Sequence, residues 1–247
     1  MSLKIDARRL LALLVVASFL GAASIPLTYA TNCPASGFTI TASLTLTGPC
    51  TYTGTEGFGL GANGITLNCN GHTISYTGTA YFTDGLWVDP GYVGDTIKNC
   101  QLTGAWDGAI SAEAVSLLTL TGNSVTGAKY GFYLTYASNV ALMGNTATGS
   151  GDYGFYLDDV FNGLVTHNTA TSSGIDGFHV FNGQGVVFKG NSADSNTGYG
   201  YFDNSVGPGT IGLGNTYIGN ECNGNTSGGS YDGAALFGPA FLCTPQG

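Results

Sequence analysis

The stretch Tyr130-Gly131-Phe132-Tyr133-Leu134 returns after 23 residues as Tyr153-Gly154-Phe155-Tyr156-Leu157, and again as Asp176-Gly177-Phe178-His179-Val180. Glycines continue this period at positions 85, 108, 131, 154, 177 and 200. A fixed period of this length indicates a solenoid, because a unit so short cannot bury its apolar face without stacking on its neighbours. We therefore expect Gly85, Gly108 and Gly131 to lie in one straight column.

Within each repeat, apolar and polar positions alternate in the manner of a β-strand. Phe132 and Leu134 would point to one side and Tyr133, between them, to the other. This period of two over aromatic and branched residues is typical of a half-buried strand. After residue 30 no segment carries a helical period, so the sequence predicts an all-β solenoid of about seven coils, each with two or three short strands.

A second column, of asparagines, runs beside the glycines. Its members are Asn123, Asn145, Asn168, Asn191 and Asn215. Asparagine side chains readily hydrogen-bond to backbone groups in turns. We expect a ladder in which each amide binds the backbone of the next coil, which accounts for these residues without a catalytic role.

The opening coils resemble those of a known family. The stretch Gly64-Ile65-Thr66-Leu67-Asn68-Cys69-Asn70-Gly71-His72-Thr73-Ile74, followed by Asp95-Thr96-Ile97-Lys98-Asn99-Cys100, is similar to right-handed parallel β-helix proteins. The later Leu-x-Gly-Asn turns resemble the NosD-like and carbohydrate-binding/sugar-hydrolase group. The resemblance covers about residues 38–220 and implies a right-handed single-stranded parallel β-helix. It does not decide function, because this fold hosts lyases, hydrolases, epimerases, phage spikes and surface proteins.

The two ends differ from the repeats. Lys4, Arg8 and Arg9 precede an apolar run from Leu10 to Ala23, and Thr28-Tyr29-Ala30 has the small residues of a cleavage site. This pattern is typical of a secretory signal peptide. We predict a signal peptide at 1–30, an N-terminal cap with the first coil at 31–60, repeats at 61–214 and a C-terminal cap at 215–247. The protein would be secreted, extracellular or periplasmic, or held at the cell surface by an uncleaved signal anchor.

The net charge of the chain argues against some classes of binding partner. After residue 30 the chain has three lysines, no arginine and 14 acidic residues, for a net charge near −11. Such a chain would be repelled by nucleic acid and by anionic lipid surfaces. We therefore expect no nucleic-acid partner, and membrane contact only through an uncleaved signal anchor.

Six cysteines in an exported chain favour disulfide bonds. Nearest-neighbour pairing would join Cys33 to Cys50, Cys69 to Cys100, and Cys222 to Cys243. We prefer this pairing because the first and last bonds would close the caps that a solenoid needs. For Cys69 and Cys100 the alternative of two buried thiols remains open.

The resemblance also implies catalytic residues, and most of them are missing. Pectate-lyase-like members need a basic residue, usually arginine, and pectin-hydrolase-like members need Asn-Thr-Asp, Asp-Asp, Gly-His-Gly and Arg-Ile-Lys. This sequence retains only Asp158-Asp159. Asp158 could still act with Asp176 and His179 as an unrecognised site, or these acids could be solvated at strand ends. No zinc-type histidine spacing or dense acidic calcium loop is present, so we predict no cofactor and no metal.

The most suggestive feature is a column of outward residues in one phase of the repeat, namely Trp87, Ile110, Tyr133, Tyr156, His179 and Phe202. A flanking column holds Asp84, Asp107, Tyr130, Tyr153, Asp176 and Tyr199. Aromatic side chains beside hydrogen-bond acceptors are typical of sugar-binding surfaces. We predict that Trp87, Tyr133, Tyr156, His179, Phe202, Asp158 and Asp176 bind ligand. The alternative is an aromatic ladder that stabilises the sheet.

Three hypotheses remain. The first is a secreted or cell-surface protein that binds a polysaccharide or a cell-envelope component through the exposed aromatic column, without catalysis. The second is a polysaccharide lyase, hydrolase or epimerase with a non-standard carboxylate and histidine site. The third is a purely structural surface protein. The missing arginine and hydrolase residues favour the first and third.

Overall fold

A computed structural model describes residues 29–31, 33–54, 56–78, 83–205, 214–232 and 242–245. These residues form strands and turns, and none of them belongs to a helix long and apolar enough to cross a membrane. Most of the predicted signal peptide lies outside the described residues. Tyr29 and Ala30, the last two residues before the predicted cleavage point, begin the first strand.

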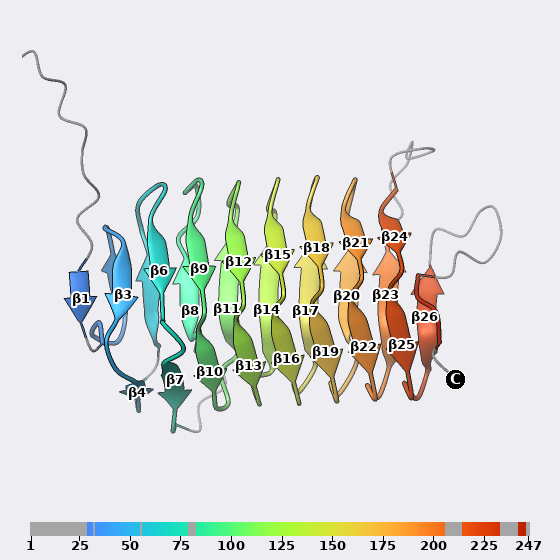
Figure 1. Ribbon diagram of the computed structural model, residues 1–247, viewed down its shortest axis with the longest axis horizontal. Coiled ribbons are helices and arrows are strands. Elements are labelled where there is room, and N and C mark those ends of the chain that lie inside the picture. Colours follow the sequence, from blue (N-terminus) through green and yellow to red (C-terminus); the bar gives the residue numbers. More distant parts are fainter. Residues whose placement is uncertain are drawn as a thin grey trace, which may run out of the picture.

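The strands form three sheets, stacked coil upon coil along the longest axis (Figure 1). Sheet 1 contains β1 (Tyr29–Thr31), β3 (Leu44–Leu46), β6 (Thr66–Asn68), β9 (Thr96–Lys98), β12 (Thr119–Thr121), β15 (Ala141–Met143), β18 (Leu164–Thr166), β21 (Val187–Lys189) and β24 (Thr216–Ile218). Sheet 2 contains β4 (Cys50–Tyr52), β7 (Thr73–Tyr76), β10 (Gln101–Thr103), β13 (Ser124–Thr126), β16 (Thr146–Thr148), β19 (Thr169–Thr171), β22 (Ser192–Asp194) and β25 (Glu221–Asn223). Sheet 3 contains β2 (Phe38–Ile40), β5 (Phe58–Leu60), β8 (Leu86–Val88), β11 (Gly108–Glu113), β14 (Tyr130–Thr135), β17 (Tyr153–Asp158), β20 (Phe178–Phe181), β23 (Tyr199–Asn204) and β26 (Gly228–Asp232).

Each strand pairs in parallel with the equivalent strand of the next coil. Leu142 of β15, for example, is in register with Leu120 of β12 and with Val165 of β18. Consecutive strands in the chain belong to different sheets, so each coil from β3 onward contributes one strand to each of the three walls of the solenoid, whereas among the described residues β1 and β2 have no partner strand in sheet 2. This arrangement confirms the predicted all-β parallel solenoid.

The predicted column of glycines is wrong at Gly108. Strand β11 pairs Ile110 with Leu86 on one side and with Phe132 on the other. Ala109 therefore lies between Gly85 and Gly131, while Gly108 pairs with Tyr130. The column needs small residues, since a Cβ built on Gly131 would lie 2.5 Å from the carbonyl oxygen of Gly154. The coil from Leu86 to Ile110 is one residue longer than the 23-residue period, and the coil from Ile110 to Phe132 is one residue shorter. Because Gly108 still falls on the period, the spacing of glycines does not reveal this change of register.

The asparagine ladder is confirmed for four members and corrected at its end. Asn168 Oδ1 accepts the backbone N–H of Asn145 at 2.8 Å and its side-chain amide at 3.0 Å. The same contacts join Asn191 to Asn220, so the ladder ends at Asn220 and not at the predicted Asn215. The separation of 29 residues from Asn191 to Asn220, against 23 from Asn168 to Asn191, explains the error. Asn215 Oδ1 instead accepts the N–H of Val186 at 3.0 Å.

A shorter ladder that the sequence analysis missed lies at the next turn of the coil. Asn196 Oδ1 accepts the N–H of Ser173 at 2.8 Å, and Asn225 Oδ1 accepts the N–H of Asn196 at 2.9 Å. Buried backbone groups in the turns thus find partners in side chains, as buried polar groups must. Both ladders hold successive coils in register.

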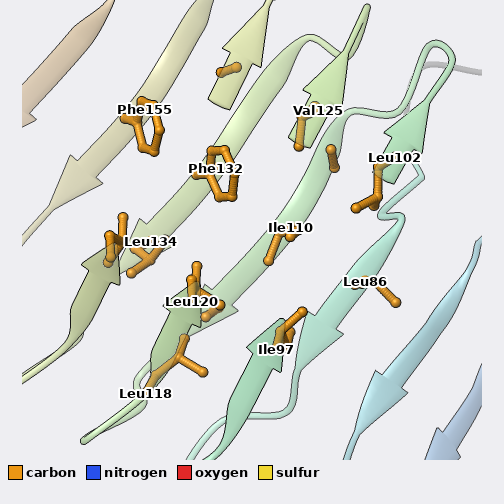
Figure 2. Packing of buried hydrophobic residues seen from close by; sticks show 14 of the residues in the cluster. Leu86, Ile97, Leu102, Ile110, Leu118, Leu120, Val125, Phe132, Leu134 and Phe155 are labelled. Atoms are coloured by element: carbon orange, nitrogen blue, oxygen red, sulfur yellow. The ribbon is translucent and has the colours of Figure 1, made fainter. Parts of the chain in front are cut away.

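Inside the solenoid, equivalent side chains stack on one another. Figure 2 shows Leu86, Ile110, Phe132 and Phe155 on successive strands of sheet 3, pointing into the core. The rings of Phe132 and Phe155 lie 4.6 Å apart between centroids, with planes 6° from parallel. The stack continues through Phe178 to Tyr201 at similar spacing. This inner stack fixes the strands whose outer faces form the site described below.

Three disulfide bonds confirm the nearest-neighbour pairing. They join Cys33 to Cys50, Cys69 to Cys100 and Cys222 to Cys243, with Cα–Cα distances of 5.4, 4.7 and 5.8 Å. The alternative of two buried thiols at Cys69 and Cys100 is therefore wrong. This bond joins neighbouring coils where the asparagine ladder begins, because the N–H of Cys100 donates to Asn123 Oδ1 at 3.0 Å.

Candidate ligand-binding face and pocket

The outer face of sheet 3 brings the predicted aromatic residues into one column. Trp87, Ser111, Tyr133, Tyr156, His179, Phe202 and Tyr231 are in register from β8 to β26. The prediction of Ile110 at the second position is wrong, because the shifted register of β11 buries Ile110 in the core and places Ser111, which is 8% exposed, in line with Trp87 and Tyr133. Tyr231 was assigned to the C-terminal cap and missed. The preceding glycines, Gly228 and Gly229, were the signal that could have found it.

Five of these rings form a continuous stack, which we call the outer ring row: Tyr133, Tyr156, His179, Phe202 and Tyr231. Successive centroids lie 5.2, 5.4, 4.6 and 4.7 Å apart, and the planes are within 10° of parallel. Each ring therefore covers a face of its neighbour. The first four are half-buried instead of fully solvent-exposed as we expected, and Tyr231 is 41% exposed. A ligand on this row would meet ring edges and hydroxyl groups.

Three further tyrosines widen the row. Tyr130 and Tyr153 stack with centroids 5.9 Å apart, and Tyr153 also lies 4.3 Å from the imidazole of His179. Tyr199 lies 5.6 Å from Tyr231. We call the eight rings together the aromatic face: Tyr130, Tyr133, Tyr153, Tyr156, His179, Tyr199, Phe202 and Tyr231.

Asp176 takes the place of a tyrosine in the flanking column and is buried. Its Oδ2 lies 2.9 Å from Nδ1 of His179, and its Oδ1 accepts the N–H of Tyr199 at 2.6 Å. Both carboxylate oxygens therefore have partners within the protein. The contact orients the imidazole within the stack. It uses Nδ1, so the other ring nitrogen, Nε2, does not contact Asp176.

Asp158 lies beside the outer ring row, at the end of β17. It is in register with Thr135 and Phe181, and its Oδ1 is buried without a hydrogen-bond partner. Burial raises the pKa of Asp158, and the charge of the adjoining Asp159 raises it further. Burial and the charge of Asp158 together raise the pKa of Tyr156 to about 12, so that hydroxyl remains a hydrogen-bond donor at ordinary pH.

A pocket opens where the outer ring row stops. Its volume is about 380 Å³, and its walls include Asp84, Trp87, Asp107, Ser111, Glu113 and Tyr133. The sequence analysis did not predict this pocket, although it placed Trp87 in the aromatic column and Asp84 in the flanking column. The acidic side chains come from β11 and from the turns that precede β8 and β11.

A hydrogen bond and an ion pair connect polar side chains that line the pocket. Ser111 Oγ donates to Asp84 Oδ1 at 2.8 Å, and Lys129 Nζ lies 3.2 Å from Asp107 Oδ1. Burial raises the pKa of Asp84, and the charge of Asp107 adds to that effect, while the hydrogen bond from Ser111 opposes it. Within the described ranges, no three carboxylate, histidine or cysteine side chains converge in a way that could hold a metal ion.

Comparison with known proteins bears on the fold. A family model described as "Right handed beta helix region" matches residues 63–231, whereas the search of curated proteins returns no match. The enzymatically active domain of tailspike protein 2 from bacteriophage CBA120 is 12% identical, with a TM-score of 0.46 over 84% of this chain and 38% of its own. The catalytic domain of a GH87 α-1,3-glucanase in complex with nigerose is 12% identical, with a TM-score of 0.32 over 89% of this chain and 62% of its own. The chain thus spans less than two thirds of either structure.

Proposed function

The chain belongs to the right-handed β-helix family, and because that fold alone decides no activity, we infer its function from the aromatic face: the protein binds a glycan on the outside of sheet 3. The partner would be a polysaccharide or a glycan-bearing component of the cell envelope. We therefore propose a location outside the cytoplasm, which the predicted signal peptide and the disulfide bonds support.

One observation supports this proposal most strongly: of the three sheets, sheet 3 is the one whose described outward positions, from β3 onward, hold aromatic rings. In sheets 1 and 2, from β3 onward, the described outward positions hold mostly threonine and serine and no aromatic ring. The solenoid therefore stacks well without an outer ring row. A continuous apolar surface that remains partly exposed on one face is typical of an interaction site.

The chemistry of the aromatic face suits sugar hydroxyl groups. Stacked rings present edges and tyrosine hydroxyls, and the half-buried carboxylate of Asp158 lies beside them at the end of β17. The hydroxyl of Tyr156, with a pKa of about 12, is protonated at neutral pH, as a tyrosine at its ordinary pKa also is, and it can donate a hydrogen bond. With a net charge near −11 after residue 30, the protein would bind neutral or cationic glycans in preference to uronates.

A binding screen with neutral, cationic and uronate polysaccharides tests the proposal. The variant Tyr133→Ala/Tyr156→Ala should lose binding, because it removes two adjoining rings and one hydroxyl donor on each. The matched control is Tyr136→Ala, since Tyr136 is 60% exposed but lies in the turn after β14. Circular dichroism and thermal melting would show that both variants fold. Wild type that binds no glycan, or a double variant that folds and binds normally, contradicts the proposal.

One contact favours a second candidate function, glycan cleavage. Asp176 holds Nδ1 of His179 at 2.9 Å, an arrangement that makes Nε2 suitable as a general base. His179→Phe separates the two functions, because phenylalanine keeps the ring row stacked and removes the base. Cleavage of a bound glycan by wild type, lost in His179→Phe with binding retained, would establish catalysis. Binding without turnover in wild type would leave the first function alone.

A further inference from the structure

The outer ring row ends at Tyr133. The ring of Tyr130 lies 5.1 Å from that of Tyr133 but is tilted by 51°, and among the described residues no ring stacks on Tyr133 from the side of Ser111. Tyr156 stacks on one side of Tyr133, and the neighbour in register on the other side is Ser111, which has no ring. Sugars stack on the faces of aromatic rings, and inside the row those faces are occupied by neighbouring rings. The Ser111 gap is therefore a place where a sugar ring can replace the missing aromatic side chain.

Trp87 is held away from this gap. Its Nε1 donates to Asp89 Oδ1 at 2.9 Å, and a Cβ added at Gly59 would collide with the indole. The indole thus lies over Gly59, on the side opposite Ser111. The resulting pocket of about 380 Å³ lies near the lower end of the size range of ligand pockets, which suits one or two sugar units.

The charges of the pocket favour a cation. Lys129 pairs with Asp107 and lies 4.7 Å from the ring centroid of Tyr130, so its charge is already engaged. Two further lining residues, Asp84, which is half-buried, and Glu113, which is exposed, leave an excess of negative charge. A cation near Asp84 would offset the cost of keeping that carboxylate ionised away from water.

We propose that this pocket binds a sugar unit that carries a protonated amino group, such as a hexosamine without its N-acetyl group. The sugar ring stacks on the open face of Tyr133, and its ammonium faces Asp84 and Glu113. The inference rests on the proposed function, because the rest of the glycan lies along the aromatic face.

Calorimetry with two matched probes tests the inference. The first is a tetramer of β-1,4-linked glucosamine, and the second is the same tetramer fully N-acetylated. At mildly acidic pH, where the sugar amines are protonated and the exposed carboxylates ionised, wild type should bind the amine form at least about tenfold more tightly, since charge-assisted hydrogen bonds add to affinity. Ethanolamine, which has the charge but no sugar ring, should bind at least about tenfold more weakly than glucosamine.

Two variants locate the preference in the pocket. Glu113→Gln should reduce the preference for the amine form severalfold, whereas Glu221→Gln, an equal loss of charge on sheet 2, should not. Ser111→Tyr should extend the outer ring row into the gap and abolish the preference. Its control is Ser124→Tyr, on an outward position of sheet 2.

The outcomes separate this inference from the function on which it rests. Equal binding of the two tetramers, or a preference that survives Ser111→Tyr, overturns the amino-sugar pocket and leaves glycan binding in place. Ethanolamine that binds as tightly as glucosamine also overturns the pocket, because ring stacking then contributes nothing. Failure of wild type to bind any glycan in the wider screen overturns the proposed function and this inference with it.

Discussion

The rings of Tyr133 and Tyr156 stack 5.2 Å apart on the outside of sheet 3, with planes 6° from parallel. On the inner side of the same two strands, Phe132 and Phe155 stack at 4.6 Å. Both distances follow from the spacing of neighbouring strands, about 4.8 Å. The outer rings therefore cover one another, which leaves ring edges for a ligand along the row, and at Tyr133 a ring face without a stacked neighbour on the side of Ser111.

Asn168→Leu should destabilise the solenoid strongly. The side chain of Asn168 is fully buried, and its amide donates to the carbonyl oxygen of Leu142 at 2.9 Å while its Oδ1 accepts from Asn145. Leucine leaves these backbone groups buried without partners, at a cost of about 3 kcal/mol or more. Denaturant unfolding of the variant measures the change in free energy.

Asn63→Leu is the control for that prediction, because Asn63 makes an exposed hydrogen bond to the N–H of Val93. Its loss should cost about 1 kcal/mol or less. Similar losses in the two variants would show that the ladder contributes nothing beyond ordinary surface hydrogen bonds.

Gly131→Ala tests the column of small residues. The added Cβ would lie 2.5 Å from the carbonyl oxygen of Gly154 and 2.8 Å from the Cβ of Ala147, so the backbone must shift. We expect a loss of about 1–3 kcal/mol in the free energy of unfolding. Gly144→Ala is the comparison. No atom lies within 4 Å of a Cβ added at Gly144, so the positive φ of this residue is the source of strain in that variant. An equal or greater loss in Gly144→Ala would contradict the predicted crowding.

Asp84→Asn should raise stability at neutral pH. Burial raises the folded-state pKa of Asp84 above its ordinary value of 3.8. The folded state therefore binds this proton more tightly than the unfolded state does, and stability present below pH 3.8 is lost as the pH rises through the folded-state pKa. Asparagine can still accept the hydrogen bond of Ser111 without ionising.

Thermal melting at several pH values measures this effect. Wild type should lose stability as the pH rises above 3.8 through the raised pKa of Asp84, and the variant should lose less. Some slope should remain, because burial also raises the pKa of Asp95 and Asp158. Identical slopes in the two proteins would show that Asp84 does not contribute.

The sequence predicted the solenoid, the disulfide pairing and the core of the outer ring row, because each depends on a period or on neighbours along the chain. It failed at Ile110 and Asn215, where coils differ in length and equal spacing points to the wrong residue. The pocket could not be predicted. It depends on the register of β11, which puts Ser111 on the outer face, and on the orientation of the Trp87 side chain, which packs over Gly59. Neither can be predicted from the spacing of residues in the sequence.

The central claim, that a glycan lies on the aromatic face, is tested most directly by tyrosine footprinting with the glycan that binds in the screen. Saturating glycan should slow the chemical modification of Tyr133, Tyr156 and Tyr231, all in the outer ring row. The rate at Tyr136, exposed outside the aromatic face, should not change. Unchanged rates across the outer ring row in the presence of bound glycan, or protection of Tyr136 alone, would contradict the account.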